Sequence, residues 1–243
     1  MIETDHSTLL DGRVRLNQPV KGYRAGMDAV LLAASLEAKA GTHVVELGCG
    51  VGGALLCAAR RLEGVHFTAW EREAWAAEIA RSNVNENALG DRVEIVSGDI
   101  SEIAPRPMAD QVFCNPPFFD DPSSLRTPAP EKQHAWLTGD TPLPVWTKAA
   151  ARLIKGQGYL TFIHRADALP DILSATEREF GSVVIKPVQP RAGREAKRVI
   201  VRVRKGGRAP ARILAPLVLH AGEERAYAPE VQAIYAGGAL VLE

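Results

Sequence analysis

The chain has 243 residues and a formal net charge of zero, with 29 basic and 29 acidic residues. This length can bury a substantial core and suits one main domain, and the balanced charge argues against a protein coated with phosphate-binding side chains. No apolar run approaches the ~18–20 residues that span a bilayer. The polar N-terminus carries no signal-peptide pattern, which favours the cytoplasm.

The cysteines and histidines do not form a metal-binding pattern. Cys49, Cys57 and Cys114 lie among apolar or small residues and lack metal-ligand spacing, so we expect reduced thiols. The six histidines contain no pair at the i, i+4 spacing of a helical zinc site. We therefore expect no metal. The oligomeric state stays open, a homodimer included.

The first forty residues are expected to form an extension that packs on a main domain comprising residues 41–243. Asp11-Gly12 lies between short apolar stretches, which is a hairpin signal. Asp28 precedes an apolar run at 29–34, so we interpret it as a helix N-cap.

From residue 41 the chain alternates between the apolar periods of strands and helices. Strands are predicted at 43–47, 65–70, 92–96, 110–114, 158–164, 182–188 and 197–203, and helices at 53–62, 73–88, 143–154 and 167–180. This alternation predicts an α/β fold with a doubly wound, mostly parallel, seven-stranded sheet. The proline-rich stretch 119–142 has no period, and we interpret it as a lid or substrate loop.

A glycine-rich turn joins the first predicted strand of the main domain to the helix that follows. Gly48, Gly50 and Gly52 allow a tight turn and a close approach of a ligand to the backbone. Glu71 ends the next strand, nineteen residues beyond Gly52. A carboxylate at that position accepts hydrogen bonds from ribose hydroxyls.

Two cofactor classes fit this turn. Gly48, Gly50 and Gly53 match the Gly-x-Gly-x-x-Gly pattern of a nicotinamide dinucleotide site. Glu46 argues against that class, since two unit charges ~5 Å apart at an effective dielectric of ~20 repel by roughly 3 kcal/mol, and a pyrophosphate would lie near it. The same carboxylate would attract S-adenosylmethionine, which carries an ammonium and a sulfonium. Glu46 thus favours S-adenosylmethionine over a dinucleotide, and both cofactor classes stay open at this point.

Asp99 follows the third strand at the same expected edge of the sheet. Taken alone, Ser97-Gly98-Asp99 is turn or cap chemistry. Together with Glu46 and Glu71, it becomes a third contact, to the adenine amino group of a cofactor.

Asn115-Pro116-Pro117-Phe118 follows the strand at 110–114 and is at least a rigid turn. An amine on an aromatic base or an amide nitrogen is a poor nucleophile, because its lone pair is delocalised. Two fixed acceptors, the Asn115 side-chain oxygen and the Pro116 carbonyl, could bind its two hydrogens and aim the lone pair at a methyl carbon. Phe118 would stack on a planar substrate.

The basic residues are unevenly distributed. Between Lys186 and Arg212 the chain has ten Lys or Arg residues and one acid, Glu195. This stretch is either a solvated strand pair with long cationic side chains or a local phosphate-binding face.

The combined motifs resemble the Rossmann-like S-adenosylmethionine-dependent methyltransferases, in the Asn-Pro-Pro-aromatic branch that methylates amino groups, over about residues 18–203. Segments 17–19, 22–24 and 28–33 are similar to bacterial tRNA adenine-N6 methyltransferases that act on adenine 37 of the valine tRNA. Segments 216–220 and 227–230 resemble the same group. The resemblance implies an antiparallel last strand at 197–203.

The resemblance also implies the residues of the site. The Asn-Pro-Pro-aromatic turn would hold the acceptor, while Tyr23 and Arg24 would cover the methionine end of the cofactor. The cofactor-binding set is Tyr23, Arg24, Glu46, Gly48, Cys49, Gly50, Gly52, Glu71, Arg72, Asp99, Ile100 and Asn115. The RNA-binding set is Lys21, Arg191, Arg194, Lys197 and Arg198. Relatives often carry Tyr where this chain has Phe118, so a hydroxyl contact is lost there.

We therefore expect an RNA adenine N6-methyltransferase whose target lies in a tRNA anticodon loop, where unpaired bases are accessible. One alternative is the same chemistry on protein glutamine, rRNA guanine N2 or DNA adenine. A nicotinamide-dependent oxidoreductase leaves residues 115–118 without a role. A non-catalytic RNA-binding module is disfavoured by the intact Asn115.

Overall fold

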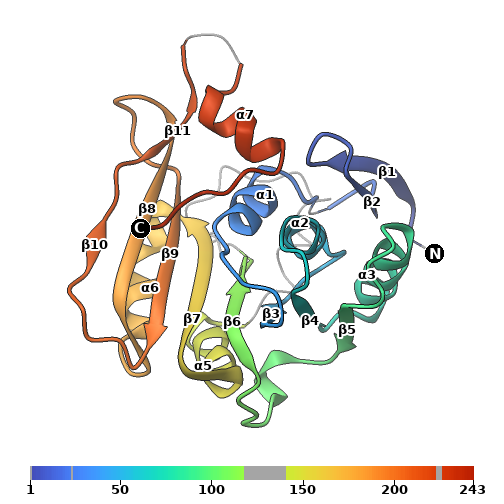
Figure 1. The fold of residues 1–243 in the computed structure, drawn as a ribbon, viewed down its shortest axis with the longest axis horizontal. Helices are drawn as coiled ribbons and strands as arrows, with labels where there is room; N and C mark the ends of the chain where they lie inside the picture. The colour runs from blue at the N-terminus through green and yellow to red at the C-terminus, as the bar shows by residue number, and fades with distance from the viewer. Residues whose placement is uncertain (1, 23, 118–140, 223–225) are drawn as a thin grey trace.

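An N-terminal hairpin and a large sheet covered by helices on both faces make up the molecule (Figure 1). The computed structural model describes residues 2–22, 24–117, 141–222 and 226–243. The predictions for Tyr23, for Phe118 and for most of the stretch 119–142 therefore lie outside the described residues. No helix in the described ranges is long and apolar enough to cross a membrane.

The predicted N-terminal hairpin is confirmed. Strand β1 (Thr4–Leu9) pairs antiparallel with β2 (Val14–Pro19), with Leu9 opposite Val14. The turn between them holds Leu10, Asp11 and Gly12 at positive φ. Residue types that tolerate a left-handed backbone are needed there, which is why Asp-Gly was informative.

Two asparagines attach the hairpin to the main domain. Asn83 lies in helix α3 (Ala74–Glu86), and Asn87 is the C-cap of that helix. Asn83 accepts a hydrogen bond from the backbone N–H of Asn17 at 2.8 Å and donates to its carbonyl at 2.9 Å. Asn87 does the same with Arg15, at 2.9 and 2.7 Å. Residues four apart share a helix face, and residues two apart on a strand point their backbone groups to the same edge. The two asparagine side chains therefore form hydrogen bonds with the backbone of β2 in place of a neighbouring strand.

Helix α1 (Met27–Ala34) follows the hairpin, but the prediction that Asp28 caps it is wrong. Gly26 occupies the N-cap position, and no side chain caps the helix. Asp28 lies inside the first turn, where its Oδ2 accepts a hydrogen bond from Nε of Arg198 at 2.9 Å. The carboxylate thus ties the helix to a strand far along the chain.

The main sheet has nine strands, in the order β10-β8-β9-β7-β6-β3-β4-β5 with β11 on β8. Its strands are β3 (His43–Leu47), β4 (His66–Glu71), β5 (Val93–Ser97), β6 (Ala109–Cys114), β7 (Ile154–Arg165), β8 (Phe180–Arg191), β9 (Arg198–Lys205), β10 (Arg212–Ile213) and β11 (Leu217–His220).

All seven predicted strands are present, and the doubly wound, mostly parallel fold is confirmed. Strand β9 runs antiparallel to both neighbours, as expected for the last long strand, while the other pairs of this sheet are parallel. The number of strands was underestimated, because β10 and β11 add to β8 beyond the predicted seven. They are two and four residues long, too short for a clear period.

Helices cover both faces. Besides α1 and α3 they are α2 (Gly53–Arg61), the short helix η1 (Ile100–Glu102), α5 (Leu143–Leu153), η2 (Ala166–Ala168), α6 (Leu169–Thr176) and α7 (Pro229–Tyr235). Adjacent residues of β3 belong to different cores: Val44 packs with the cluster of α1, α2 and α3, and Val45 with that of α5 and α6. Strand side chains alternate between faces, so one strand supports both layers.

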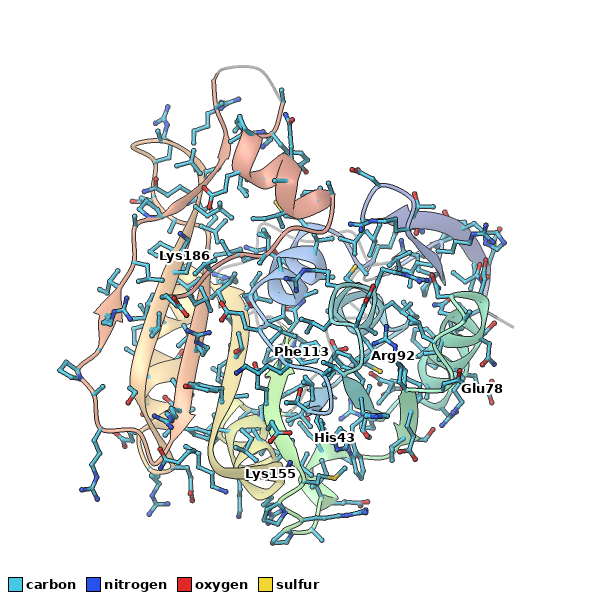
Figure 2. The ribbon with its side chains drawn as sticks, in the orientation of Figure 1. His43, Glu78, Arg92, Phe113, Lys155 and Lys186 are labelled. Atoms are coloured by element: carbon cyan, nitrogen blue, oxygen red, sulfur yellow. The ribbon has the colours of Figure 1, made fainter. Side chains whose placement is uncertain are left out.

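Strand β3 lies at the point where the chain reverses its direction across the sheet. The chain proceeds from β3 through β4 to β5 on one side and through β6 to β7 on the other. His43 and Lys155 mark the amino edge (Figure 2), where Asp110 accepts hydrogen bonds from the His43 backbone and the Lys155 ammonium. Ligands of such sheets bind at the opposite, carboxyl edge, in the crevice at the reversal.

Candidate functional site

The glycine turn and the Asn-Pro-Pro turn leave the sheet side by side. In the parallel pairing of β3 and β6, Leu47 lies opposite Cys114. The next residue on each strand is Gly48 and Asn115, and neighbouring strands are ~4.8 Å apart. On the other side Leu47 pairs with Trp70, one residue before Glu71. The residues predicted from distant motifs thus converge on one crevice.

The glycines of the turn have different roles. Gly48 has a φ of +66°, and a Cβ there would lie 2.5 Å from Cη2 of Trp146, so helix α5 requires glycine at this position. Gly50 has a φ of +55°, and a Cβ there would meet no heavy atom of the described residues within 4 Å. The backbone is therefore open to a ligand at Gly50 and closed at Gly48.

Glu46 is a buried acid beneath this turn, with 2% of its surface exposed. Its Oε2 has no hydrogen-bond partner among the described residues. Burial raises the pKa of its carboxyl well above the ordinary value, and the negative charge of Glu71 adds to the rise, while the backbone amide of Leu55 opposes it. A buried carboxylate with an unused oxygen is stabilised by a cationic ligand.

Glu71 is held in place by the glycine turn itself. Its Oε2 accepts a hydrogen bond from the Gly50 amide at 2.7 Å, and its Oε1 accepts one from the Glu73 amide at 2.8 Å. Burial raises the pKa of this carboxyl, and both amides oppose the rise. Each carboxylate oxygen can accept more than one hydrogen bond, so Glu71 can still bind a hydroxyl donor.

Asp99 behaves as the turn residue that its local sequence suggested. Its carboxylate accepts a hydrogen bond from the Ser101 amide at 2.8 Å, at the start of η1, and lies 3.9 Å from Nη1 of Arg72. The bond from Ser101 lowers the pKa of Asp99. Ile100 is buried behind it. The adenine contact expected of Asp99 stays a prediction.

The acceptor turn is partly enclosed. Asn115 is half-buried, Pro116 is buried and Pro117 is exposed. Cys49 and Cys114 flank the two turns as buried thiols, and burial raises the pKa of both well above the ordinary value. Raised pKa values disfavour the reactive thiolate, as expected for reduced thiols, and the cofactor contact of Cys49 stays a prediction.

The segment before α1 is tied to the hairpin. Arg24 donates from Nη1 to Asp5 at 2.7 Å and to the Pro19 carbonyl at 2.8 Å. Gln18 is buried, and its Oε1 accepts a hydrogen bond from the Ala25 amide at 2.9 Å. The contact of Arg24 with the cofactor stays a prediction.

Asn83 is a site residue that the motifs did not reveal. Besides holding Asn17, its Nδ2 donates to the Val51 carbonyl inside the glycine turn at 2.9 Å, and the residue is fully buried. It therefore links hairpin, helix α3 and glycine turn. The available signal was the pair of asparagines four residues apart on a predicted helix, because buried amides are unfavourable without specific partners.

The predicted RNA-binding residues separate into groups. Arg191, Arg194 and Lys197 surround the turn between β8 and β9, at the carboxyl edge of the sheet. Arg198 begins β9 and is paired with Asp28, both side chains being mostly covered. Lys21 follows the N-terminal hairpin. Among the residues that the structure describes, no group of three or more His, Cys, Asp or Glu is arranged to hold a metal ion.

A doubly wound sheet with a glycine turn, two buried acids and an Asn-Pro-Pro turn at its reversal point defines a Rossmann-like, S-adenosylmethionine-dependent methyltransferase. The methyltransferase small domain family matches residues 25–127. More specifically, the chain belongs to the tRNA1(Val) (adenine(37)-N6)-methyltransferase family.

The relatives support this assignment. The enzyme of that name from Porphyromonas gingivalis is 31% identical over 77% of each chain. The one from Aliivibrio salmonicida is 28% identical over 61% of this chain, and the alignment spans 62% of that enzyme's length. A crystal structure of a predicted O-methyltransferase from Agrobacterium tumefaciens has a TM-score of 0.74 at 27% identity, covering 88% of this chain and 98% of that one.

Proposed function

We propose that the protein transfers the methyl group of S-adenosylmethionine to the N6 amine of an adenine in a tRNA anticodon loop, with adenine 37 of the valine tRNA as the first candidate. One observation carries the proposal: the Asn-Pro-Pro turn leaves β6 next to the glycine turn that covers the buried Glu46. The names of the relatives supply the acceptor, since they are tRNA adenine-N6 methyltransferases.

The residues at the reversal point fit this cofactor. The unused oxygen of Glu46 suits the ammonium group, and the open face of Gly50 leaves room for the ligand. Glu71 remains able to accept hydrogen bonds from ribose hydroxyls. A dinucleotide would instead bring its pyrophosphate towards a buried carboxylate, which costs about 3 kcal/mol at ~5 Å and an effective dielectric of ~20.

The chain's contribution to transfer is to orient the amine. S-adenosylmethionine supplies an electrophilic methyl group. The Asn115 side-chain oxygen and the Pro116 carbonyl each accept one amine hydrogen, so the lone pair faces the methyl carbon. Prolines on both sides of that carbonyl limit its movement before substrate binds, which lowers the barrier. The proton can leave after the nitrogen has become cationic, so no strong base is required.

An amine fits this turn better than a hydroxyl, although one similar structure is a predicted O-methyltransferase. A hydroxyl has one hydrogen to donate, whereas the turn offers two fixed acceptors. Protein glutamine, rRNA guanine N2 and DNA adenine satisfy the same two acceptors and remain the alternatives.

A tRNA substrate implies a cytoplasmic location. The boundary between the extension and the main domain at residue 40 also remains our proposal.

Separate incubations of the enzyme with labelled S-adenosylmethionine and total tRNA, rRNA, DNA or protein extract test the acceptor. We expect label in tRNA, recovered as N6-methyladenosine after digestion. Label in protein alone would refute the RNA substrate. The cofactor is tested by thermal shift: S-adenosylhomocysteine should raise the melting temperature and NAD should not.

A further inference from the structure

A concavity of about 930 Å³ lies beside the turn that joins β8 to β9, away from the glycine turn. Cationic side chains and two aromatic rings line it, among them Arg191, Arg194, Lys197, His220 and Tyr227. In the sheet β8 is three strands from β6, which is about 14 Å at ~4.8 Å per strand. The concavity is thus at the same carboxyl edge as Asn115 but separate from it.

The rim of this concavity is cationic. Arg194 donates its amide to the Arg191 carbonyl at 3.1 Å, and Gly193 at a φ of +73° closes the turn between them. Lys197 lies 3.5 Å from Glu195, but their side chains are 67% and 90% exposed, so water screens this pair. Among the lining residues that the structure describes, two arginines and a lysine against one acid make the rim positive and suited to phosphate.

The aromatic wall belongs to a stack of three rings. His220 and Tyr227 have ring centroids 5.2 Å apart and planes inclined by 13°. Tyr227 continues onto Tyr235 of helix α7, at 4.9 Å and 17°. Nδ1 of His220 lies 3.2 Å from the Ala226 carbonyl. A carbonyl only accepts, so Nδ1 carries a proton and donates it to Ala226, which fixes the orientation of the ring.

We propose that this concavity is a subsite for an unpaired nucleotide of the RNA substrate, distinct from the target adenine. Its base continues the stack on the face of the His220 ring that is turned away from Tyr227, and Arg191, Arg194 and Lys197 hold its phosphates. The inference rests on the proposed function and adds a second anchoring point to it. Phosphate binding alone would explain the cationic rim. The adjacent stack indicates a base, because unpaired RNA is recognised by stacking on aromatic rings combined with charge.

The rings are tested by measuring the affinity of a tRNA anticodon stem-loop at constant salt. His220→Ala removes the ring on which the base stacks, and Tyr227→Leu removes the ring that supports it. Each should weaken binding about tenfold, since a stacked base contributes ~1–3 kcal/mol. Tyr159→Leu and His66→Ala are matched controls at the opposite edge of the sheet and should change affinity less than twofold. Tyr227→Phe keeps the ring and should bind like wild type. Equal affinity of Tyr227→Leu and Tyr159→Leu would overturn the proposal.

The cationic rim is tested by comparing two arginine variants, one in the rim and one outside it. Arg194→Ala should reduce the slope of log affinity against log salt by about 0.7 to 1, as one lost phosphate contact does. Arg208 is exposed beyond the end of β9, at the opposite edge, so Arg208→Ala should leave the slope unchanged. Equal slopes for the two variants would remove Arg194 from the subsite.

Stem-loops with a single abasic position separate failure of this inference from failure of the proposed function. One position other than the methylated adenine should weaken wild-type binding about tenfold and leave Tyr227→Leu binding nearly unchanged, because the stack is already lost. If tRNA is methylated but no such position exists, only the subsite is wrong. If no RNA is methylated, the proposed function fails first. Retained stabilisation by S-adenosylhomocysteine establishes that each variant is folded.

Discussion

The crevice beside β3 and the turn between β8 and β9 lie on the same edge of one sheet, but they carry opposite charge in opposite environments. Glu46 and Glu71 are 2% and 8% exposed, whereas the Lys197 side chain is 67% exposed. Buried charges interact strongly over short distances and are costly without a partner. Exposed charges attract polyanions but are screened by salt. The first region therefore suits a cationic cofactor, and we propose that the second recruits the RNA substrate.

Removing the acceptor side chain should have the largest effect. Asn115→Ala loses one of the two groups that orient the amine, so methyl transfer in a single turnover should fall by ~10²–10³-fold, as when an oriented catalytic hydrogen bond is deleted. Binding of S-adenosylhomocysteine should change less than twofold. Asn85→Ala, an exposed asparagine on α3, is the matched control. An unchanged transfer rate would exclude Asn115 from catalysis.

The next largest effect is expected from the buried amide that supports the cofactor region. Asn83→Ala deletes hydrogen bonds to Asn17 and Val51 and leaves buried backbone groups unpaired, which should lower the free energy of unfolding by ~2–4 kcal/mol. Urea denaturation measures this loss. The KM for S-adenosylmethionine should rise, because the Val51 carbonyl is no longer held, whereas kcat at saturation should change little. A kcat loss equal to that of Asn115→Ala would contradict a positioning role.

Glu46→Gln removes the buried negative charge. It should weaken S-adenosylhomocysteine binding by ~10-fold or more at neutral pH, because one hydrogen bond to a charged group is lost. Wild-type affinity should rise with pH as Glu46 ionises, through a pKa well above the ordinary carboxyl value. The affinity of the variant should lack this rise. Calorimetric titration across pH measures both, and parallel profiles for the two proteins would assign the ionisation to another group.

The same substitution has an opposite effect on the ligand-free protein. Because the folded-state pKa of Glu46 is raised, its contribution to stability is fully present below the unfolded pKa and is lost as pH rises through the folded pKa. Glu46→Gln removes that loss, so the variant should become increasingly more stable than wild type as pH rises above the ordinary carboxyl range. Thermal unfolding at a series of pH values without ligand tests this sign.

The smallest effect is expected from a change in salt concentration, which should weaken tRNA binding but not cofactor binding. Three phosphate contacts to single-stranded RNA predict a loss of about twentyfold in tRNA affinity between ~50 and ~200 mM salt. S-adenosylhomocysteine affinity should change less than twofold over the same range, because Glu46 and Glu71 are shielded from ions. A tRNA affinity independent of salt would count against the basic turn.

Local patterns predicted the elements well where the chain is strongly periodic or punctuated by glycine and proline. Strand β3 was located to the residue, because an apolar run ends at Gly48. The Asp28 prediction failed because Arg198, 170 positions away, binds that carboxylate. Strands β10 and β11 were not predicted, because they are short and form by pairing with β8.

The amino-acid sequence alone determined the class of fold, the two turns and the acidic residues of the site, since each depends on local backbone preference or on charge at a strand end. Tertiary structure alone decided that Leu47 faces Cys114, that Asn83 holds the glycine turn, and that His220 stacks on Tyr227 beside a basic loop. These contacts join segments far apart in the chain. Their energies come from burial and geometry that no local pattern encodes.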